Sequence, residues 1–296
     1  MPANFRAQSA KKPLPGKVVF LAHIIAAVLL LLAIGCETNE QKSIGGLLVK
    51  HQTPVKWEIL EEGLSYTRLD YQRKSDGKSI AIAVLRIDPA LFSFRLIGNT
   101  TIENMEEGWV DRMVEEEDVV AAVNGGYFLE GFEPTGLLVS EGKVLNPWKK
   151  GAGSGVFRVE GKKAAIDWSK ERDPGWEDDE MAIQSHPLVV EPGGEPGIYA
   201  NRNRYRERTL VAVDREDHVI ILCSFRNMNG HDLSGLDLYE AMEVLMAGEK
   251  RGGLSVKAAL NLDGGASTAM SVKHPGLDIK IRSINQVANA LAVYRR

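Results

Sequence analysis

The segment 258–270, AALNLDGGASTAM, contains the best candidate for a catalytic carboxylate. An apolar run leads into Asp263, which is followed by Gly264, Gly265 and the hydroxyl group of Ser267. A strand end would fix the carboxylate, the glycines would let a ligand or another backbone approach, and the hydroxyl can donate a hydrogen bond. We interpret Asp263 as a catalytic residue at a strand end. The alternative is an ordinary turn, since Asp and Gly are common turn residues.

A second segment, 119–128, has the same pattern of an apolar run followed by a polar residue and two glycines. It ends in Asn124, Gly126, Tyr127 and Phe128. The Asn124 amide can both donate to and accept from a sugar hydroxyl, and the aromatic pair can form a stacking wall. The alternative is a hairpin turn with core aromatic residues, because Asn-Gly is a strong hairpin signal.

A third segment, 201–208, carries four arginines before an apolar run. The planar guanidinium group suits the oxygens of phosphate or carboxylate. We interpret Arg202, Arg204 and Arg206 as solvated residues, because long charged side chains are mostly exposed. Arg208 directly precedes the apolar run and is therefore the candidate for an inward role.

Short apolar runs bounded by Gly, Pro, Asn and Asp predict the strands that position these residues. The runs cover residues 80–87, 119–123, 155–159, 209–213, 219–223, 258–262 and 287–294. Residues 213–219 predict a hairpin between two of these strands. Apolar residues at helical spacing predict helices within 103–117 and 238–246.

Seven motifs, in this order, resemble the phosphodiester glycosidase family. They are NGGYF at 124–128, GLLVSEG at 136–142, AIQSHPLVVEPG at 182–193, Arg208-Thr209, the helix after Gly235, LNLDGGASTAM at 260–270 and VANALAV at 287–293. The resemblance spans about Trp57 to Arg296. It implies one α/β (α+β) domain with a mixed sheet and many short strands.

The resemblance also implies a set of site residues. These are Asp263 and Arg208 as catalytic residues, and Asn124, Gly126, Tyr127, Phe128, Gln184, Gly264, Gly265 and Ser267 as substrate-binding residues. Three departures from the family pattern bear on substrate fit: His186 replaces Gly, residues 210–212 replace Ala-Ile-Gly, and Ala266 replaces a third Gly.

The activity implied by the resemblance is a glycoside hydrolase that releases a sugar from a sugar-phosphate diester or a related envelope glycan. Phosphate is a good leaving group, so the reaction needs a carboxylate and a cationic clamp more than a strong general acid. We assign these roles to Asp263 and Arg208, with Glu130 and Glu133 as weaker candidates for a second carboxylate. The alternatives are a glycan-binding lipoprotein without catalysis and a glycosidase acting on glycans without phosphate.

Composition excludes several other classes of function. The chain has 296 residues, 44% of them hydrophobic, which is typical of a folded domain. With 36 basic and 40 acidic residues and a formal charge of −4, a nucleic-acid partner is not expected. The six histidines lack the spacing of a zinc site, and the sequence identifies no cofactor.

The N-terminus predicts export. Basic residues precede the uncharged stretch 18–35, and Leu32 to Cys36 resembles a bacterial lipoprotein signal. We therefore expect a signal peptide at 1–35, a lipidated Cys36 with a tether at 36–56, and the domain at 57–296. The chain would be a membrane-anchored lipoprotein of the cell envelope, facing the periplasm or exterior, with Cys223 as a lone buried thiol. The alternative is an uncleaved signal anchor, since the stretch is about long enough to span a bilayer.

Overall fold

The computed structural model describes most of the chain beyond the predicted tether. The described residues are 43–44, 46–50, 54–98, 110–113, 115, 118–170, 173–228 and 231–296. The predicted signal peptide and Cys36 lie outside them, so lipidation remains a prediction. Among the described residues, no helix is long and apolar enough to span a membrane.

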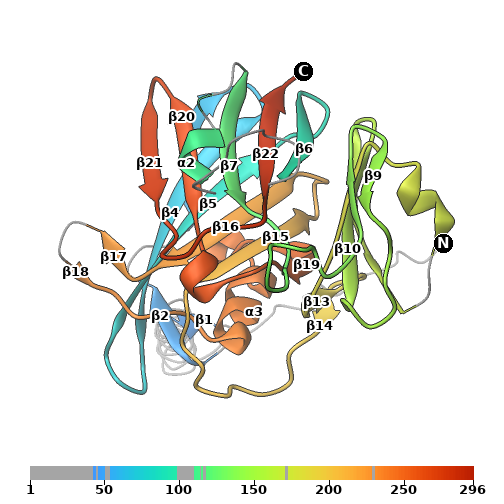
Figure 1. The fold of residues 1–296 in the computed structure, drawn as a ribbon. Helices are drawn as coiled ribbons and strands as arrows, with labels where there is room; N and C mark the ends of the chain where they lie inside the picture. The colour runs from blue at the N-terminus through green and yellow to red at the C-terminus, as the bar shows by residue number, and fades with distance from the viewer. Residues whose placement is uncertain are drawn as a thin grey trace, which may run out of the picture. The chain divides into compact units, whose positions relative to one another are not determined.

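Strands predominate and form three large sheets and one small one (Figure 1). The ten-stranded central sheet contains β1 (Ser43–Ile44), β2 (Leu48–Lys50), β4 (Leu64–Arg73), β5 (Ser79–Ile87), β16 (Val219–Phe225), β15 (Arg208–Asp214), β19 (Val256–Asn261), β13 (Leu188–Glu191) and β14 (Glu195–Pro196) in that order, with β3 (Glu58–Glu61) paired to β4. A five-stranded sheet contains β21 (Leu277–Ile281), β20 (Met270–His274), β7 (Val119–Asn124), β22 (Asn289–Arg295) and β6 (Phe92–Gly98).

The remaining elements are shorter. A second five-stranded sheet contains β11 (Lys163–Trp168), β10 (Gly155–Glu160), β12 (Met181–Ser185), β8 (Leu138–Ser140) and β9 (Lys143–Asn146), and a two-stranded sheet pairs β17 (Asn227–Met228) with β18 (His231–Asp232). The helices are α2 (Val110–Met113), α3 (Leu238–Met246) and the 3-10 turns η1 (Pro174–Glu177), η2 (Glu249–Arg251) and η3 (Gly265–Ser267).

The predicted α/β (α+β) class with a mixed sheet is correct only in part. Many short strands and a helix after Gly235 are present, but the fold is mostly β-sheet. Every strand pairing among the described residues is antiparallel, including the hairpin of β15 and β16, in which Val213 pairs with Val219. The sheets are therefore antiparallel rather than mixed.

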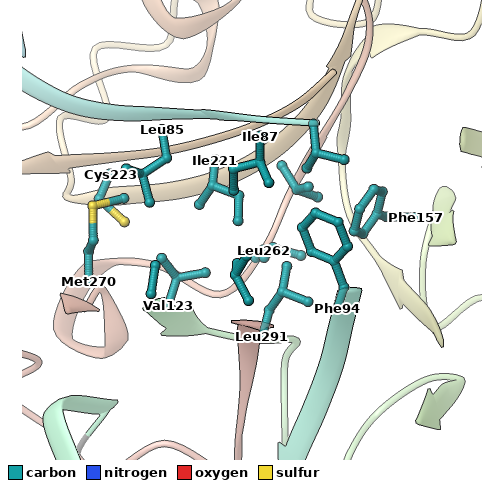
Figure 2. Packing of buried hydrophobic residues seen from close by; sticks show 14 of the residues in the cluster. Leu85, Ile87, Phe94, Val123, Phe157, Ile221, Cys223, Leu262, Met270 and Leu291 are labelled. Carbon is teal, nitrogen blue, oxygen red and sulfur yellow. The ribbon is translucent and has the colours of Figure 1, made fainter. Parts of the chain in front are cut away.

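Both faces of the central sheet are covered, which explains its almost continuous apolar strands. On β5, Ile80, Ile82 and Val84 belong to a core cluster that includes residues of α3. The alternate residues, such as Leu85 and Ile87, face the strands of the two five-stranded sheets, as Figure 2 shows. The side chains of successive strand residues point to opposite faces, so a sheet buried on both sides needs apolar residues at nearly every position.

The seven predicted strands are confirmed, with each end within two residues of its predicted position. They are the strands predicted at 80–87, 119–123, 155–159, 209–213, 219–223, 258–262 and 287–294. The helix predicted at 238–246 is α3, and its N-terminus has a capping box made by Asp237 and Glu240. Of the helix predicted within 103–117, the described part is α2; residues 103–109 lie outside the description.

A buried ion pair ties α3 to the edge of the central sheet. The Arg73 guanidinium on β4 donates to both carboxylate oxygens of Glu240, at 2.5 and 2.9 Å. It also donates to the Ser234 hydroxyl and the Gly235 carbonyl, each at 2.8 Å, and lies 3.6 Å from the Tyr205 ring centroid. Arg73 and Glu240 are 2% and 0% exposed, and Arg73 has one further carboxylate partner, the partly exposed Asp76 at 3.3 Å. Removal of the Glu240 charge therefore takes away the only buried counterion of Arg73 among the described residues.

We expect Glu240→Gln to lower the free energy of unfolding by about 3–5 kcal/mol, because the Arg73 charge loses its buried counterion. Urea denaturation followed by circular dichroism measures this loss. The matched control is Asp70→Asn, which breaks a pair with Arg68 at 3.0 Å whose side chains are 39% and 46% exposed, and it should cost no more than about 1 kcal/mol. Equal, small losses in both variants would contradict the structural role of the buried pair.

Candidate active site

The three segments with candidate chemistry meet where strands of two sheets begin or end. β7 ends at Asn124, β15 begins at Arg208, and β19 leads into Asp263. The Asp263 N–H donates to the carbonyl of Gly125 at 3.1 Å, and the N–H of the preceding residue donates to the carbonyl of Thr209 at 2.9 Å. These backbone bonds bring the three candidate segments together.

The Asn124 side chain is the centre of this meeting point. It is 1% exposed, and its amide nitrogen donates to the Asp263 carbonyl at 2.7 Å. Its amide oxygen accepts from the Thr209 hydroxyl at 2.6 Å and from the Ala269 N–H at 3.0 Å. These three bonds use most of the capacity of the amide, so we assign Asn124 to positioning the site rather than to binding a sugar hydroxyl.

Asp263 occupies a half-buried position with donors around it. Its Oδ1 accepts from the Gly264 N–H at 2.8 Å, and the Ser267 hydroxyl also donates to the carboxylate. Burial raises the pKa of Asp263 above its ordinary value, while the two hydrogen bonds and the nearby His186 act in the opposite direction. Gly265 has a φ of +63°, a conformation that favours glycine, and begins the turn η3 that places Ser267.

Tyr127 is close enough to Asp263 and Arg208 for both charges to affect its pKa. Its ring stacks on His186, with 4.4 Å between centroids, and its hydroxyl accepts from the Asn261 amide at 2.7 Å. Burial raises the pKa of Tyr127 to about 12; the charge of Asp263 adds to this shift and the charge of Arg208 opposes it. The segments of Asp263 and Arg208 are joined directly, because the Gly265 N–H donates to the Glu207 carbonyl at 2.8 Å. The phenol remains protonated at neutral pH and is available as a hydrogen-bond donor.

Arg208 is held by its backbone contacts and is not neutralised by a carboxylate. Its Nε donates to the Leu236 carbonyl at 3.0 Å and an Nη donates to the Arg204 carbonyl at 2.9 Å. Among the described residues, no Asp or Glu forms a salt bridge with it. Burial lowers the pKa of Arg208 from its ordinary value, yet a guanidinium remains charged in proteins. The site therefore holds a fixed positive charge that can accept an anion.

Gln184 and Gly126 lie beside the site, and their polar groups form hydrogen bonds with other parts of the protein. The Gln184 side chain is 2% exposed; its oxygen accepts from the Leu137 N–H at 3.0 Å and its nitrogen donates to the Lys149 carbonyl at 3.0 Å. The Gly126 N–H donates to the Asn289 amide oxygen at 2.7 Å. We assign both residues to holding the loops that border the site.

The residues after Tyr127 form the outer part of the site. Phe128 is partly buried and stacks on Phe132, with 5.6 Å between ring centroids. Glu130 and Glu133 are exposed on the same turn, and neither has a side-chain contact with Asp263 in the described structure. The two carboxylates of a glycosidase are about 5–9.5 Å apart and need not touch, so a second carboxylate from this turn stays a prediction.

Sequence reasoning missed three buried polar residues that organise the site. Thr209 bonds to Asn124, Asn261 bonds to Tyr127, and Asn289 bonds to Gly126. They are 0%, 1% and 1% exposed, respectively. Their signal in the sequence is a single hydroxyl or amide within an apolar strand, since such a group is rarely buried without a partner.

Other features lie outside this site. A cavity of about 770 Å³ beside α2 and β20 is lined by none of the predicted site residues. Among the described residues, no cluster of three or more His, Cys, Asp and Glu side chains is suited to a metal ion. Cys223 is fully buried, and burial raises the pKa of its thiol to about 12, so it is an unreactive core residue as predicted.

The fold is similar to two solved structures. The catalytic domain of zebrafish N-acetylglucosamine-1-phosphodiester alpha-N-acetylglucosaminidase, auto-inhibited by its pro-peptide, matches with a TM-score of 0.58 and 15% identity over 84% of this chain and 89% of that domain. A hypothetical protein from Synechocystis matches with a TM-score of 0.54 and 15% identity over 83% of this chain, which spans 64% of the Synechocystis protein. A search of curated protein sequences gives no match.

The family assignment comes from the sequence profile rather than from these distant structures. The profile of the phosphodiester glycosidase family matches residues 117–294, more than half of the chain. This range contains Asn124, Arg208 and Asp263, together with the buried polar residues that position them. The chain therefore belongs to the phosphodiester glycosidase family.

Proposed function

We propose that the protein is a glycosidase that releases a sugar from a phosphodiester. The observation that carries this proposal is the contact between the three candidate segments: the Gly265 N–H donates to the Glu207 carbonyl at 2.8 Å, and the Asn124 amide donates to the Asp263 carbonyl at 2.7 Å. A carboxylate stabilises or attacks the anomeric carbon, and an unneutralised guanidinium a short distance away suits a departing phosphate. Family membership supports the reaction class.

In the proposed reaction the bond between the anomeric carbon and the phosphate oxygen breaks. Asp263 either attacks the anomeric carbon or removes a proton from an attacking water, and the phosphate monoester leaves with the bonding electron pair. Arg208 stabilises the charge that develops on the phosphate oxygens. The raised pKa of Asp263 suits a group that must take up a proton, since such a base works best near the ambient pH.

Asp263→Asn should reduce turnover at least about a hundredfold, because the amide keeps the shape of the carboxylate and loses its negative charge. Release of phosphate monoester from a sugar-1-phosphodiester measures the loss. Binding of the unreacted substrate should persist, and circular dichroism should report an unchanged fold. The matched control, Asp278→Asn, changes an exposed residue on β21 and should retain full activity. A folded Asp263→Asn variant with full activity would remove Asp263 from the chemistry.

Arg208→Lys should reduce kcat/KM more on a phosphodiester than on a plain glycoside of the same sugar. Lysine keeps the positive charge but loses the planar fork that reads phosphate oxygens. We expect the difference between the two losses to be about tenfold or more, the value of one hydrogen bond to a charged group. Parallel steady-state assays on the two substrates provide the measurement. Equal losses would show that Arg208 does not contact the leaving phosphate.

We further propose that the substrate is a glycan of the cell envelope or an exopolysaccharide. The support is the leader, in which Leu32 to Cys36 resembles a lipoprotein signal. Acylation of Cys36 would hold the domain at a membrane surface. Cys36→Ser should then abolish partitioning into detergent, and a variant that partitions and is processed as the parent does would contradict lipidation.

A further inference from the structure

A second cavity adjoins the candidate active site on the side of Arg208. Its volume is about 420 Å³, and its lining includes Arg208, Arg202, Arg204, Tyr199 and Pro187. Pro187 follows the histidine that stacks on Tyr127, so this wall of the cavity continues directly into the site around Asp263. A sugar at Asp263 with its phosphate on Arg208 would direct the rest of the substrate into this cavity.

The cavity has an excess of positive charge. Its lining contains three arginines and one carboxylate, Asp237. That carboxylate is 3% exposed and accepts hydrogen bonds from the backbone N–H groups of Arg204 and Tyr239, both at 2.9 Å. Within the described part of the chain, no acidic side chain forms a salt bridge with Arg202, Arg204 or Arg208. By contrast, Arg226 nearby pairs with Glu207 at 3.2 Å.

Like charges gathered in this way are unfavourable unless an anion offsets them. Burial is the main cause that lowers the pKa of Arg208, and the charge of the neighbouring Arg206 acts in the same direction, whereas Tyr127, Asp237 and Glu207 act in the opposite direction. An anionic ligand in the cavity would relieve this repulsion and form charge-assisted hydrogen bonds with the guanidinium groups.

The arginine segment is fixed by its backbone. The Leu236 N–H donates to the Arg206 carbonyl at 2.8 Å. Gly235 permits this approach, because a Cβ atom there would lie 2.6 Å from the Arg206 nitrogen. The Tyr205 ring packs on the buried Arg73 guanidinium. The position from which Arg204 extends is therefore set by the fold, since its N–H also donates to Asp237 at 2.9 Å.

Tyr199 adds an aromatic surface to the cavity. Its side chain is 79% exposed although it is large and mostly apolar. An exposed aromatic ring beside charged donors provides a face for the carbon skeleton of a sugar or polyol.

We infer that this cavity binds the leaving part of the substrate, and that this part carries a second phosphate recognised by Arg202 and Arg204. The inference rests on the proposed function, since it places the phosphate that is released on Arg208. A phosphate suits the cavity because it offers three acceptor oxygens and up to two charges to several guanidinium groups. The substrate class is therefore a chain whose units are joined by repeated phosphodiesters.

The test measures equilibrium binding without turnover. Propyl phosphate and propane-1,3-diol bisphosphate are titrated by calorimetry into the full-length chain in a neutral detergent. The parent should bind the bisphosphate at least about tenfold more tightly, as expected for added charge-assisted hydrogen bonds. The double variant Arg202→Gln/Arg204→Gln should lose this preference and keep its affinity for propyl phosphate within about twofold, because Arg208 is unchanged.

The matched control is Arg215→Gln/Arg251→Gln, which removes the same charge from exposed residues of another cavity. It should keep the preference for the bisphosphate. Equal affinities of the parent for the two probes, or a preference that survives in the Arg202→Gln/Arg204→Gln variant, would overturn the inference. Binding is measured apart from hydrolysis, so the two proposals can fail separately. A protein that prefers the bisphosphate but does not cleave a phosphodiester would refute the proposed function, and the anion-binding site would still stand.

Discussion

The buried amide of Asn124 is the interaction on which the site depends. It joins the end of β7 in one sheet to Thr209 on β15 in another, and it also holds the loop from Asp263 to Ala269. All of these groups are away from water, and a buried donor or acceptor that loses its partner costs about 1–3 kcal/mol. The amide thus couples the packing of two sheets to the position of the candidate catalytic carboxylate, Asp263.

The close approach of the loop after β7 to β22, its neighbour in the same sheet, also requires a missing side chain. Gly125 follows Asn124, and a Cβ atom there would lie 1.9 Å from the Asn289 amide oxygen. Because Gly125 has no Cβ atom, the Asn289 amide oxygen can accept from the Gly126 N–H. The Asn289 backbone carbonyl can accept from the Gly125 N–H. Gly125 is therefore needed for packing against β22, and a Cβ atom at Gly126 would lie 3.3 Å from Ile183 on β12. Gly264 and Gly265 shape the turn that carries Asp263.

Local features of the fold were readable from the sequence because they depend on neighbouring residues. The apolar runs of β5, β15, β16 and β19 and the helix at 238–246 follow from burial and spacing alone. The antiparallel arrangement could not be predicted, because burial of both sheet faces gives continuous apolar runs whatever the strand direction. Which strand ends meet depends on long-range pairings such as that of β7 with β22.

The candidate site also has features that could be predicted from the sequence and features that could not. Asp263 and Arg208 were identified because charged residues beside apolar strands are conspicuous, and the structure brings their segments together. The contacts of Asn124 and Gln184 could not be foreseen, because an amide within a motif is compatible with a sugar or with a backbone partner. The cavity lined by Arg202 and Arg204 could not be predicted, because its lining also includes Pro187 and Gly197 from an earlier part of the chain. The charge of the two arginines matters only beside Arg208.

The most direct measurement is the product released by the unmodified protein from two substrates that share one sugar. One is a sugar-1-phosphodiester and the other a plain glycoside, and the released sugar and phosphate monoester are quantified by mass spectrometry. A site built from Asp263 and an unneutralised Arg208 should release sugar and phosphate monoester in equal amounts from the diester, and much more slowly from the glycoside. Binding of the diester without hydrolysis, or hydrolysis of the two substrates at the same rate, would contradict the account.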